Sequence, residues 1–220
     1  MATRSLGRQF GWLWGAYAVS AYGSGLALSA FPLIAIRVLH SGPADVSALA
    51  AAGLAVGAVI AVPLAPWVEF RRKRPVMMAM DLIRFAALIS IPVAFALGVL
   101  SYGQLLVAAV ITGAAKIAFN AASGANLKVL VKPEDLLVAT GRFESTTWTA
   151  TMVGPPLGGA AIGLFGPVIT VVADAVSYLL SAAGVAAIGG HEPRPVRQPR
   201  SAGPLCECRR APRAARGGTG

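Results

Sequence analysis

The chain has 220 residues, of which 56% are hydrophobic and only 13% are charged, and its formal net charge is +10. Soluble domains carry about 25% charged residues, so this composition excludes a water-soluble globular domain and favours a chain embedded in a lipid bilayer. The positive charges are clustered between apolar runs, which argues against a general nucleic-acid-binding protein and for charged loops between membrane spans.

Apolar runs along residues 1–190 predict an all-α membrane domain, a bundle of six transmembrane helices. Each predicted helix is long enough for a bilayer span, which takes about 20 residues. The first run, after Arg4 and Arg8, exceeds the about 7–15 apolar residues of a secretory signal and predicts an uncleaved helix. Turns at 102–103 and 165–167 divide two longer runs. The predicted helices cover about residues 13–36, 46–68, 76–100, 104–126, 142–164 and 168–188.

The basic residues predict the orientation of this bundle. With six spans, both termini fall on the same side as the basic loops that follow the second and fourth helices. Of the 19 Lys and Arg residues, only Arg37 and Lys116 lie elsewhere. Basic loops are retained in the cytoplasm. We therefore expect both termini to be cytoplasmic, in a multi-pass protein of the bacterial inner (plasma) membrane.

Residues 191–220 form a tail rich in Arg, Pro, Gly and Ala, which predicts a disordered cytoplasmic segment. One interpretation is a linker that contacts anionic lipid headgroups. The other, which we favour, is a frame-shifted or truncated end. The two cysteines, Cys206 and Cys208, lie in this tail, and His191 is their nearest possible helper. We therefore expect no metal site and no cofactor.

Charged residues inside the predicted spans are the first functional candidates, because charges are costly in a bilayer. Asp81 and Arg84 share one helical face and are able to pair. Their pair is either an interfacial salt bridge or part of a conformational latch made with the preceding basic loop. Lys116, with Asn120 on the same face, either reaches the near interface or lines a polar path. Asp174 is the deepest acid, and the sequence does not show whether it meets Lys116.

A Gly-Pro segment interrupts the fifth predicted helix. Pro155 removes a backbone donor and bends a helix, whereas Gly154, Gly158 and Gly159 permit close helix contact. The segment is either a static kink or a site at which the helix flexes. Elsewhere the chain lacks a Ser-His-Asp arrangement, a phosphate-binding Gly-Lys loop and a His-x-x-x-His pair, so we do not expect an enzyme.

Together these motifs resemble the N-terminal half of a major facilitator superfamily (MFS) transporter, in the bacterial drug and siderophore exporter branch. The loop after the second helix is similar to the superfamily's Gly-x-x-x-Asp-Arg-x-x-Arg-Arg loop, with Ala65, Glu69 and Phe70 replacing the usual Gly, Asp and Arg. Residues 130–136 are similar to the branch's next cytoplasmic loop, 154–159 to the Gly-Pro motif of proton-coupled exporters, and 174–178 to its sixth helix. The resemblance assigns a gating role to Glu69, Arg71, Arg72, Lys73, Arg74, Asp81 and Arg84.

The resemblance implies proton-coupled export of a small molecule such as a drug, siderophore or metabolite. In that interpretation, the intramembrane residues Lys116, Asn120 and Asp174 are the candidates for the transport path, and the Gly-Pro segment 154–159 is where the helix would flex. The family has about twelve helices in two halves, so a second half, a second copy or a partner would complete the path. One alternative is an inactive membrane remnant or interaction protein. A weaker one is a membrane anchor whose arginine tail binds lipid or nucleic acid, although we expect no nucleic-acid partner.

Overall fold

The computed structural model describes residues 7–53, 55, 59 and 72–188, and this part of the chain is built of helices joined by short turns. The predicted all-α architecture is thus confirmed for the described residues. Residues 43–53 are also helical. The remaining elements, in chain order, are α1 (Arg8–Ala27), α2 (Ala30–Arg37), α4 (Lys73–Ala96), α5 (Tyr102–Leu130), the 3-10 turn η1 (Pro133–Asp135), α6 (Leu136–Phe165) and α7 (Pro167–Ala186).

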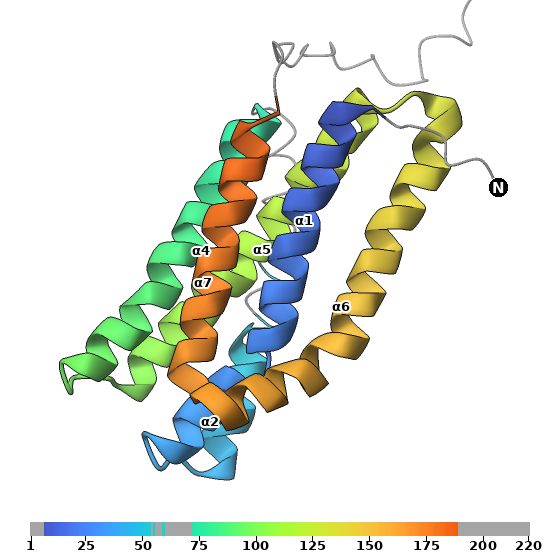
Figure 1. Cartoon of the computed structure of the whole chain (residues 1–220). Helices are drawn as coiled ribbons and strands as arrows, with labels where there is room; N and C mark the ends of the chain where they lie inside the picture. Colours follow the sequence, from blue (N-terminus) through green and yellow to red (C-terminus); the bar gives the residue numbers. More distant parts are fainter. Residues whose placement is uncertain (1–6, 54, 56–58, 60–71, 189–220) are drawn as a thin grey trace, which may run out of the picture.

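The helices form a bundle in which α1 and α4 both pack along α7 (Figure 1). Helix α6 runs along α1, and α5 runs along α4. Helix α6 bends in its second half, the half that contains Pro155 and Pro156. A proline inside a helix removes a backbone hydrogen bond and clashes with the preceding turn, which explains the bend.

Within the described residues, four segments are long and apolar enough to cross a membrane: Arg8–Arg37, Lys73–Ala96, Tyr102–Leu130 and Pro167–Ala186. Helix α6 has 30 residues but is not among them. Its Thr, Gly and Pro residues lower its hydropathy without preventing a helix. Most of the second predicted span, 46–68, lies outside the described residues, so a total of six spans stays a prediction.

The helix boundaries differ from the expected ones in two places. The first predicted helix, 13–36, is divided into α1 and α2 by a turn at Leu28 and Ser29. Pro32 explains the division. It has no backbone N–H to donate to the carbonyl group of Leu28, and its ring clashes with that carbonyl group. Helices α5 and α6 extend into the segment between 126 and 142, where we expected a loop. Charges there end the apolar span but are compatible with helix.

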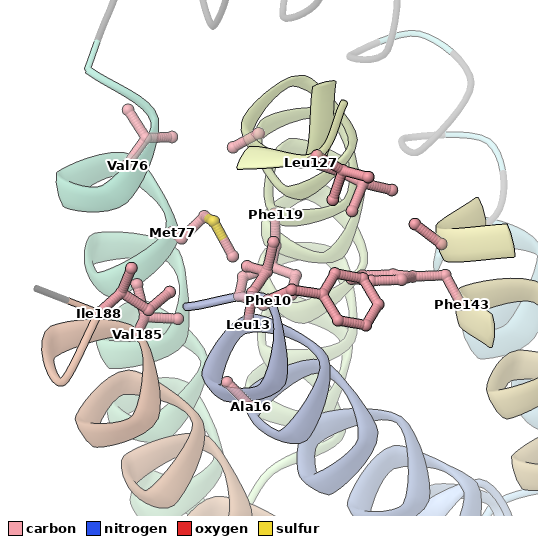
Figure 2. Close-up of a cluster of buried hydrophobic side chains, with 13 residues drawn as sticks. Phe10, Leu13, Ala16, Val76, Met77, Phe119, Leu127, Phe143, Val185 and Ile188 are labelled. Atoms are coloured by element: carbon pink, nitrogen blue, oxygen red, sulfur yellow. The ribbon is translucent and has the colours of Figure 1, made fainter. Parts of the chain in front are cut away.

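Two apolar clusters fill the bundle, with polar residues between them along α1 and α4. The first cluster joins the start of α1 to α4, α5 and the end of α7, and Figure 2 shows Leu13, Met77, Phe119 and Val185 within it. The second lies at the other end of the bundle and includes Ile34 and Leu88. Burial of such side chains contributes about 1.5–3 kcal/mol each where water is excluded.

Candidate functional site

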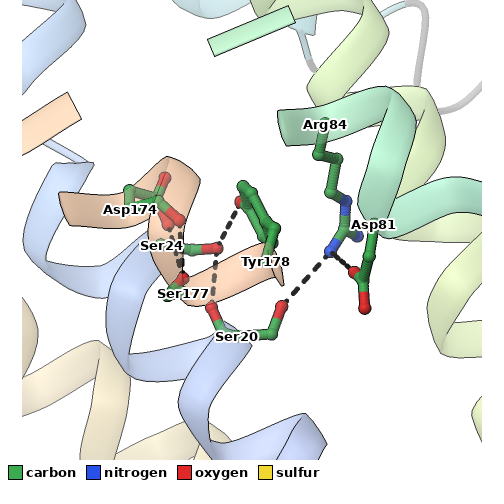
Figure 3. A network of polar contacts seen from close by, with 7 residues as sticks. All are labelled: Ser20, Ser24, Asp81, Arg84, Asp174, Ser177 and Tyr178. Carbon is green, nitrogen blue, oxygen red and sulfur yellow. Dashed lines mark hydrogen bonds and ion pairs between the residues drawn. The ribbon is translucent and has the colours of Figure 1, made fainter. Parts of the chain in front are cut away.

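A layer of polar residues, all buried except the half-buried Ser24, crosses the bundle between the two apolar clusters, and we call it the polar layer (Figure 3). Helix α1 contributes two hydroxyls one turn apart, α4 an acid and a base, and α7 an acid with two hydroxyls. The polar layer consists of Ser20, Ser24, Asp81, Arg84, Asp174, Ser177 and Tyr178. Burying a polar group costs free energy unless the group is hydrogen-bonded or paired, so the stability of this layer depends on the contacts of these residues.

The ion pair of α4 anchors one side of the polar layer. Arg84 Nη1 lies 3.5 Å from Asp81 Oδ1, and the two side chains are 2% and 0% exposed. The same nitrogen donates to Ser20 Oγ at 3.3 Å, which links α4 to α1. Asp81 and Arg84 are thus inside the bundle rather than at its surface. The structure shows the pair that the spacing predicted, with both side chains buried inside the protein.

Two aromatic rings flank the guanidinium of Arg84. Its Cζ atom lies 5.2 Å from the ring centroid of Phe119 on α5 and 5.1 Å from that of Tyr178 on α7. In the described part of the chain, Arg84 Nε and Nη2 have no hydrogen-bond partner. Cation–π contacts of this kind contribute about 2 kcal/mol when desolvated. The two rings therefore stabilise the guanidinium group in place of hydrogen bonds that Nε and Nη2 would otherwise donate.

Hydroxyl groups connect α1 to α7. Ser24 Oγ donates to the Ser20 carbonyl oxygen at 2.9 Å and lies 2.8 Å from the Tyr178 hydroxyl. Because Ser24 has one proton to donate, the Tyr178 hydroxyl is the donor in the second contact. A chain of contacts thus runs from Tyr178 through Ser24 and Ser20 to Arg84 and its partner. The sequence interpretation did not include Ser20 and Ser24, although their spacing on one face of an apolar helix indicated a shared polar partner.

Asp174 lies beneath α1 and is only 4% exposed. Ser177 Oγ donates to the backbone carbonyl oxygen of Asp174 at 2.7 Å and lies 3.3 Å from its Oδ1, so the carboxylate receives at most a share of the one hydroxyl proton. A Cβ atom on Gly23 would overlap the Ser177 side chain and lie 2.8 Å from Asp174 Oδ1, so glycine lets α1 pass this close to both residues of α7. Gly23 therefore determines how deeply Asp174 is covered.

A cavity of about 440 Å³, which we call cavity A, opens beside the polar layer between α1, α2, α5 and α7. Lys116 and Asp174 both line it, so the structure brings together the two charged residues that the sequence could not relate. The other polar side chains at its wall are Ser24, Thr112 and Tyr178. Apolar residues, among them Leu28, Phe31, Leu49 and Leu88, make up most of the remainder.

A second cavity of about 240 Å³, cavity B, adjoins cavity A and shares Ser24, Leu28 and Lys116 with it. Arg84 and Asn120 line cavity B, together with the aromatic and hydroxyl side chains Tyr17, Thr147 and Thr151. Lys116 and Asn120 are both exposed on α5. The three predicted path residues thus line adjoining cavities, with Lys116 where the two meet.

Backbone-to-backbone contact joins α6 to α1. A Cβ on Gly154 would lie 2.7 Å from the Cα of Gly25, and one on Gly158 would overlap the carbonyl oxygen of Leu26. Gly159 is different, because a Cβ there would meet nothing within 4 Å. Of the predicted flexing motif, Gly154 and Gly158 therefore form a helix contact and Gly159 does not.

Two side-chain hydrogen bonds join the same two helices at a second place. The Trp14 indole donates to Thr146 Oγ1 at 3.0 Å, and the hydroxyls of Tyr17 and Thr147 lie 2.8 Å apart. Helices α1 and α6 are thus joined near the start of α1 and again near its end.

The predicted gating loop is described only in part. Glu69 and Arg71 lie outside the described residues, whereas Arg72 directly precedes α4 and Lys73 begins it. Arg74 Nη1 donates to the Ile188 carbonyl oxygen at 2.8 Å. This bond joins the start of α4 to the carbonyl end of α7, where a positive charge is favourable. Among the residues that the structure describes, no three His, Cys, Asp or Glu side chains form a metal-binding group.

Comparison with known proteins gives the family. No curated protein and no solved structure matches the chain. The family model described as Major Facilitator Superfamily matches residues 13–216. The match includes all the helices described above except the first turns of α1, as well as much of the tail. The chain therefore belongs to the Major Facilitator Superfamily, a family of multi-pass membrane transporters rather than enzymes.

Proposed function

We propose that this transporter exports a small molecule across the bacterial cell membrane in exchange for protons. One observation carries the proposal: cavity A has an exposed lysine, Lys116, and a buried acid, Asp174, inside a bundle whose other contacts are largely apolar. Charges at membrane depth are retained where a substrate or an ion uses them. The acid gives the cavity a group able to accept a proton, and the lysine gives it a group able to bind a substrate.

The ion pair in α4 is the proposed gate. Asp81 and Arg84 connect α4 to α1 through Ser20, and Arg74 connects α4 to the end of α7. Together with Glu69 and Arg71 of the preceding loop, these contacts would stabilise one conformation of the bundle. Substrate in cavity A would act on the gate through Tyr178, which contacts both the cavity and Arg84.

The transport path is completed, in this proposal, by a second six-helix unit, which a second half, a second copy or a partner would supply. Transporters with paired repeats place their substrate between the two units and expose it to each side in turn. The proposal includes drugs, siderophores and metabolites as substrates, because the residues of the polar layer do not distinguish among these three classes.

An efflux assay tests the proposed function. The chain is expressed in a bacterial host that lacks its own exporters, and the accumulation of fluorescent dyes and of labelled metabolites is followed. We expect lower accumulation with the wild-type chain, loss of the effect in Asp81→Asn, and loss on collapse of the proton gradient. The matched control is Asp45→Asn, an exposed acid that lines neither cavity and whose carboxylate accepts from the Gly42 backbone N–H.

Unchanged accumulation of every compound on expression of the wild-type chain would refute the proposal. The chain would then be better explained as a membrane remnant or an interaction protein. Export that persists when the proton gradient is collapsed would refute proton coupling alone.

A further inference from the structure

Lys116 occupies the middle of α5, and its position excludes a purely interfacial role. It lies 14 residues from each end of Tyr102–Leu130, which is about 21 Å at 1.5 Å per residue. A lysine side chain spans roughly 6 Å, a small part of that distance, so its ammonium group cannot reach either end of the helix. The group must therefore be solvated or bound within the cavities that it lines.

The other charges near cavity A are already engaged. Arg84 pairs with Asp81 and lies between two aromatic rings. Asp174 is almost fully buried where α1 packs on α7 at Gly23, and the Ser177 hydroxyl lies 3.3 Å from its Oδ1. Lys116 is exposed, and no ion pair joins it to an acid anywhere in the described ranges. Lys116 thus presents an available positive charge where cavities A and B meet.

The rest of cavity A fits the body of an organic molecule. Its volume of about 440 Å³ lies within the range of about 300–1,000 Å³ typical of small-molecule sites. Phe31, Leu49 and Leu88 supply an apolar wall, and the hydroxyl of Thr112 lies one turn from Lys116 on α5. An apolar wall next to one available cation matches a molecule that has an apolar body and one negative group.

We propose that the transported substrate is an organic anion, whose carboxylate or sulfonate pairs with Lys116 while its apolar body fills cavity A. This inference rests on the proposed function and specifies the class of its substrate. Asp174 also lines cavity A and would repel an anion, but its side chain is almost fully buried, whereas that of Lys116 is exposed. The anion therefore meets the cation before it meets the acid.

Binding of three matched probes to the purified full-length chain tests the inference. In lipid nanodiscs, isothermal titration calorimetry compares 2-naphthoate, 2-naphthamide and (2-naphthylmethyl)ammonium, which share a ring system and differ in charge. We expect the anion to bind about tenfold more tightly than the amide, the ratio that about 1.4 kcal/mol produces. Lys116→Met should abolish that ratio without changing the affinity of the amide, and Lys116→Arg should retain it.

The matched control is Lys132→Met, an exposed lysine that follows α5 and lines neither cavity. It should leave the ratio unchanged, and circular dichroism should show that every variant keeps its helical content. Tightest binding of the ammonium probe, lost in Asp174→Asn, would overturn the inference in favour of a cation site. Equal affinity for all three probes, or no binding of any of them, would also overturn it.

The two proposals fail separately. Lys116-dependent binding of naphthoate by a chain that exports nothing in cells would refute the proposed function and leave the anion site in place. Export in cells by a chain that does not discriminate among the three probes would refute only the substrate class.

Discussion

The hydroxyl of Tyr178 on α7 donates to the hydroxyl of Ser24 on α1 across 2.8 Å, and both side chains line cavity A. The ring of Tyr178 also lies 5.1 Å from the guanidinium carbon of Arg84. Tyr178 therefore lines the cavity and also contacts Arg84 of the α4 ion pair through its ring. A ligand that displaces the ring of Tyr178 must also change the surroundings of Arg84.

Substitution of Tyr178 separates these two contacts. Tyr178→Phe removes the hydroxyl and keeps the ring, so the free energy of unfolding should fall by about 1 kcal/mol, the net contribution of a typical hydrogen bond. Tyr178→Leu also removes the ring and should cost more, because Arg84 loses one aromatic face. Denaturation in mixed micelles, followed by circular dichroism, measures both. Equal losses in the two variants would show that the ring does not stabilise Arg84.

The buried ion pair should show strong coupling. Asp81→Asn or Arg84→Gln leaves one buried charge without its partner, so each should lower the free energy of unfolding by about 3–5 kcal/mol. The double variant should cost clearly less than the sum of the two, because no unpaired charge remains. Glu144→Gln, at an exposed position on α6, is the control and should have little effect. Simple additivity of the two single variants would contradict the pairing.

The glycines of α6 should differ sharply from one another. A methyl group on Gly158 overlaps the backbone of α1, whereas one on Gly159 meets nothing within 4 Å. Gly158→Ala should therefore lower the free energy of unfolding by about 1–3 kcal/mol through overpacking. Gly159→Ala should be neutral or stabilising, because alanine favours helix by up to about 1 kcal/mol over glycine. Thermal unfolding of the two variants side by side gives the comparison, and similar effects would argue against close contact with α1.

Labelling of the native cysteines can test the prediction that the C-terminus lies on the cytoplasmic side of the membrane. The chain contains only two cysteines, Cys206 and Cys208, and both follow the last described helix. A membrane-impermeant maleimide should label them in inside-out vesicles and not in intact spheroplasts. Ser41→Cys in a chain with both native cysteines replaced by serine should show the opposite pattern, because Ser41 lies on the predicted outer side. Labelling of the native cysteines in spheroplasts would reverse the predicted orientation.

The sequence pattern predicted where helices occur more accurately than it predicted the residues at which they begin and end. Apolar runs located the described spans because a bilayer requires them, but charge marked the limits of an apolar run rather than of a helix. The helical segments on either side of η1 therefore extend beyond the predicted ends. The turn at Leu28 had a local cause in Pro32, which was hidden by the continuous hydrophobicity of residues 9–36.

The candidate site was predictable only where its residues are neighbours in the sequence. Asp81 and Arg84 are one turn apart, so their spacing alone predicts the contact. Lys116 and Asp174 lie on different helices, and only the packing of α7 and α5 around one cavity brings them together. Phe119 gave no sign of a role, since an aromatic residue in an apolar helix is ordinary until a buried arginine is placed beside it.

The contact between Gly25 and Gly154, with the hydrogen bond from Trp14 to Thr146, has a mechanical consequence. Because the two helices touch at two separate points, the stretch of α6 from Thr146 to Gly154 cannot slide or tilt independently of α1. If α6 moves, α1 moves with it. Helix α1 contains Ser24, which lines cavity A, and Gly23, which packs against Asp174. A joint movement of α1 and α6 would therefore expose Asp174 and change the shape of cavity A at the same time.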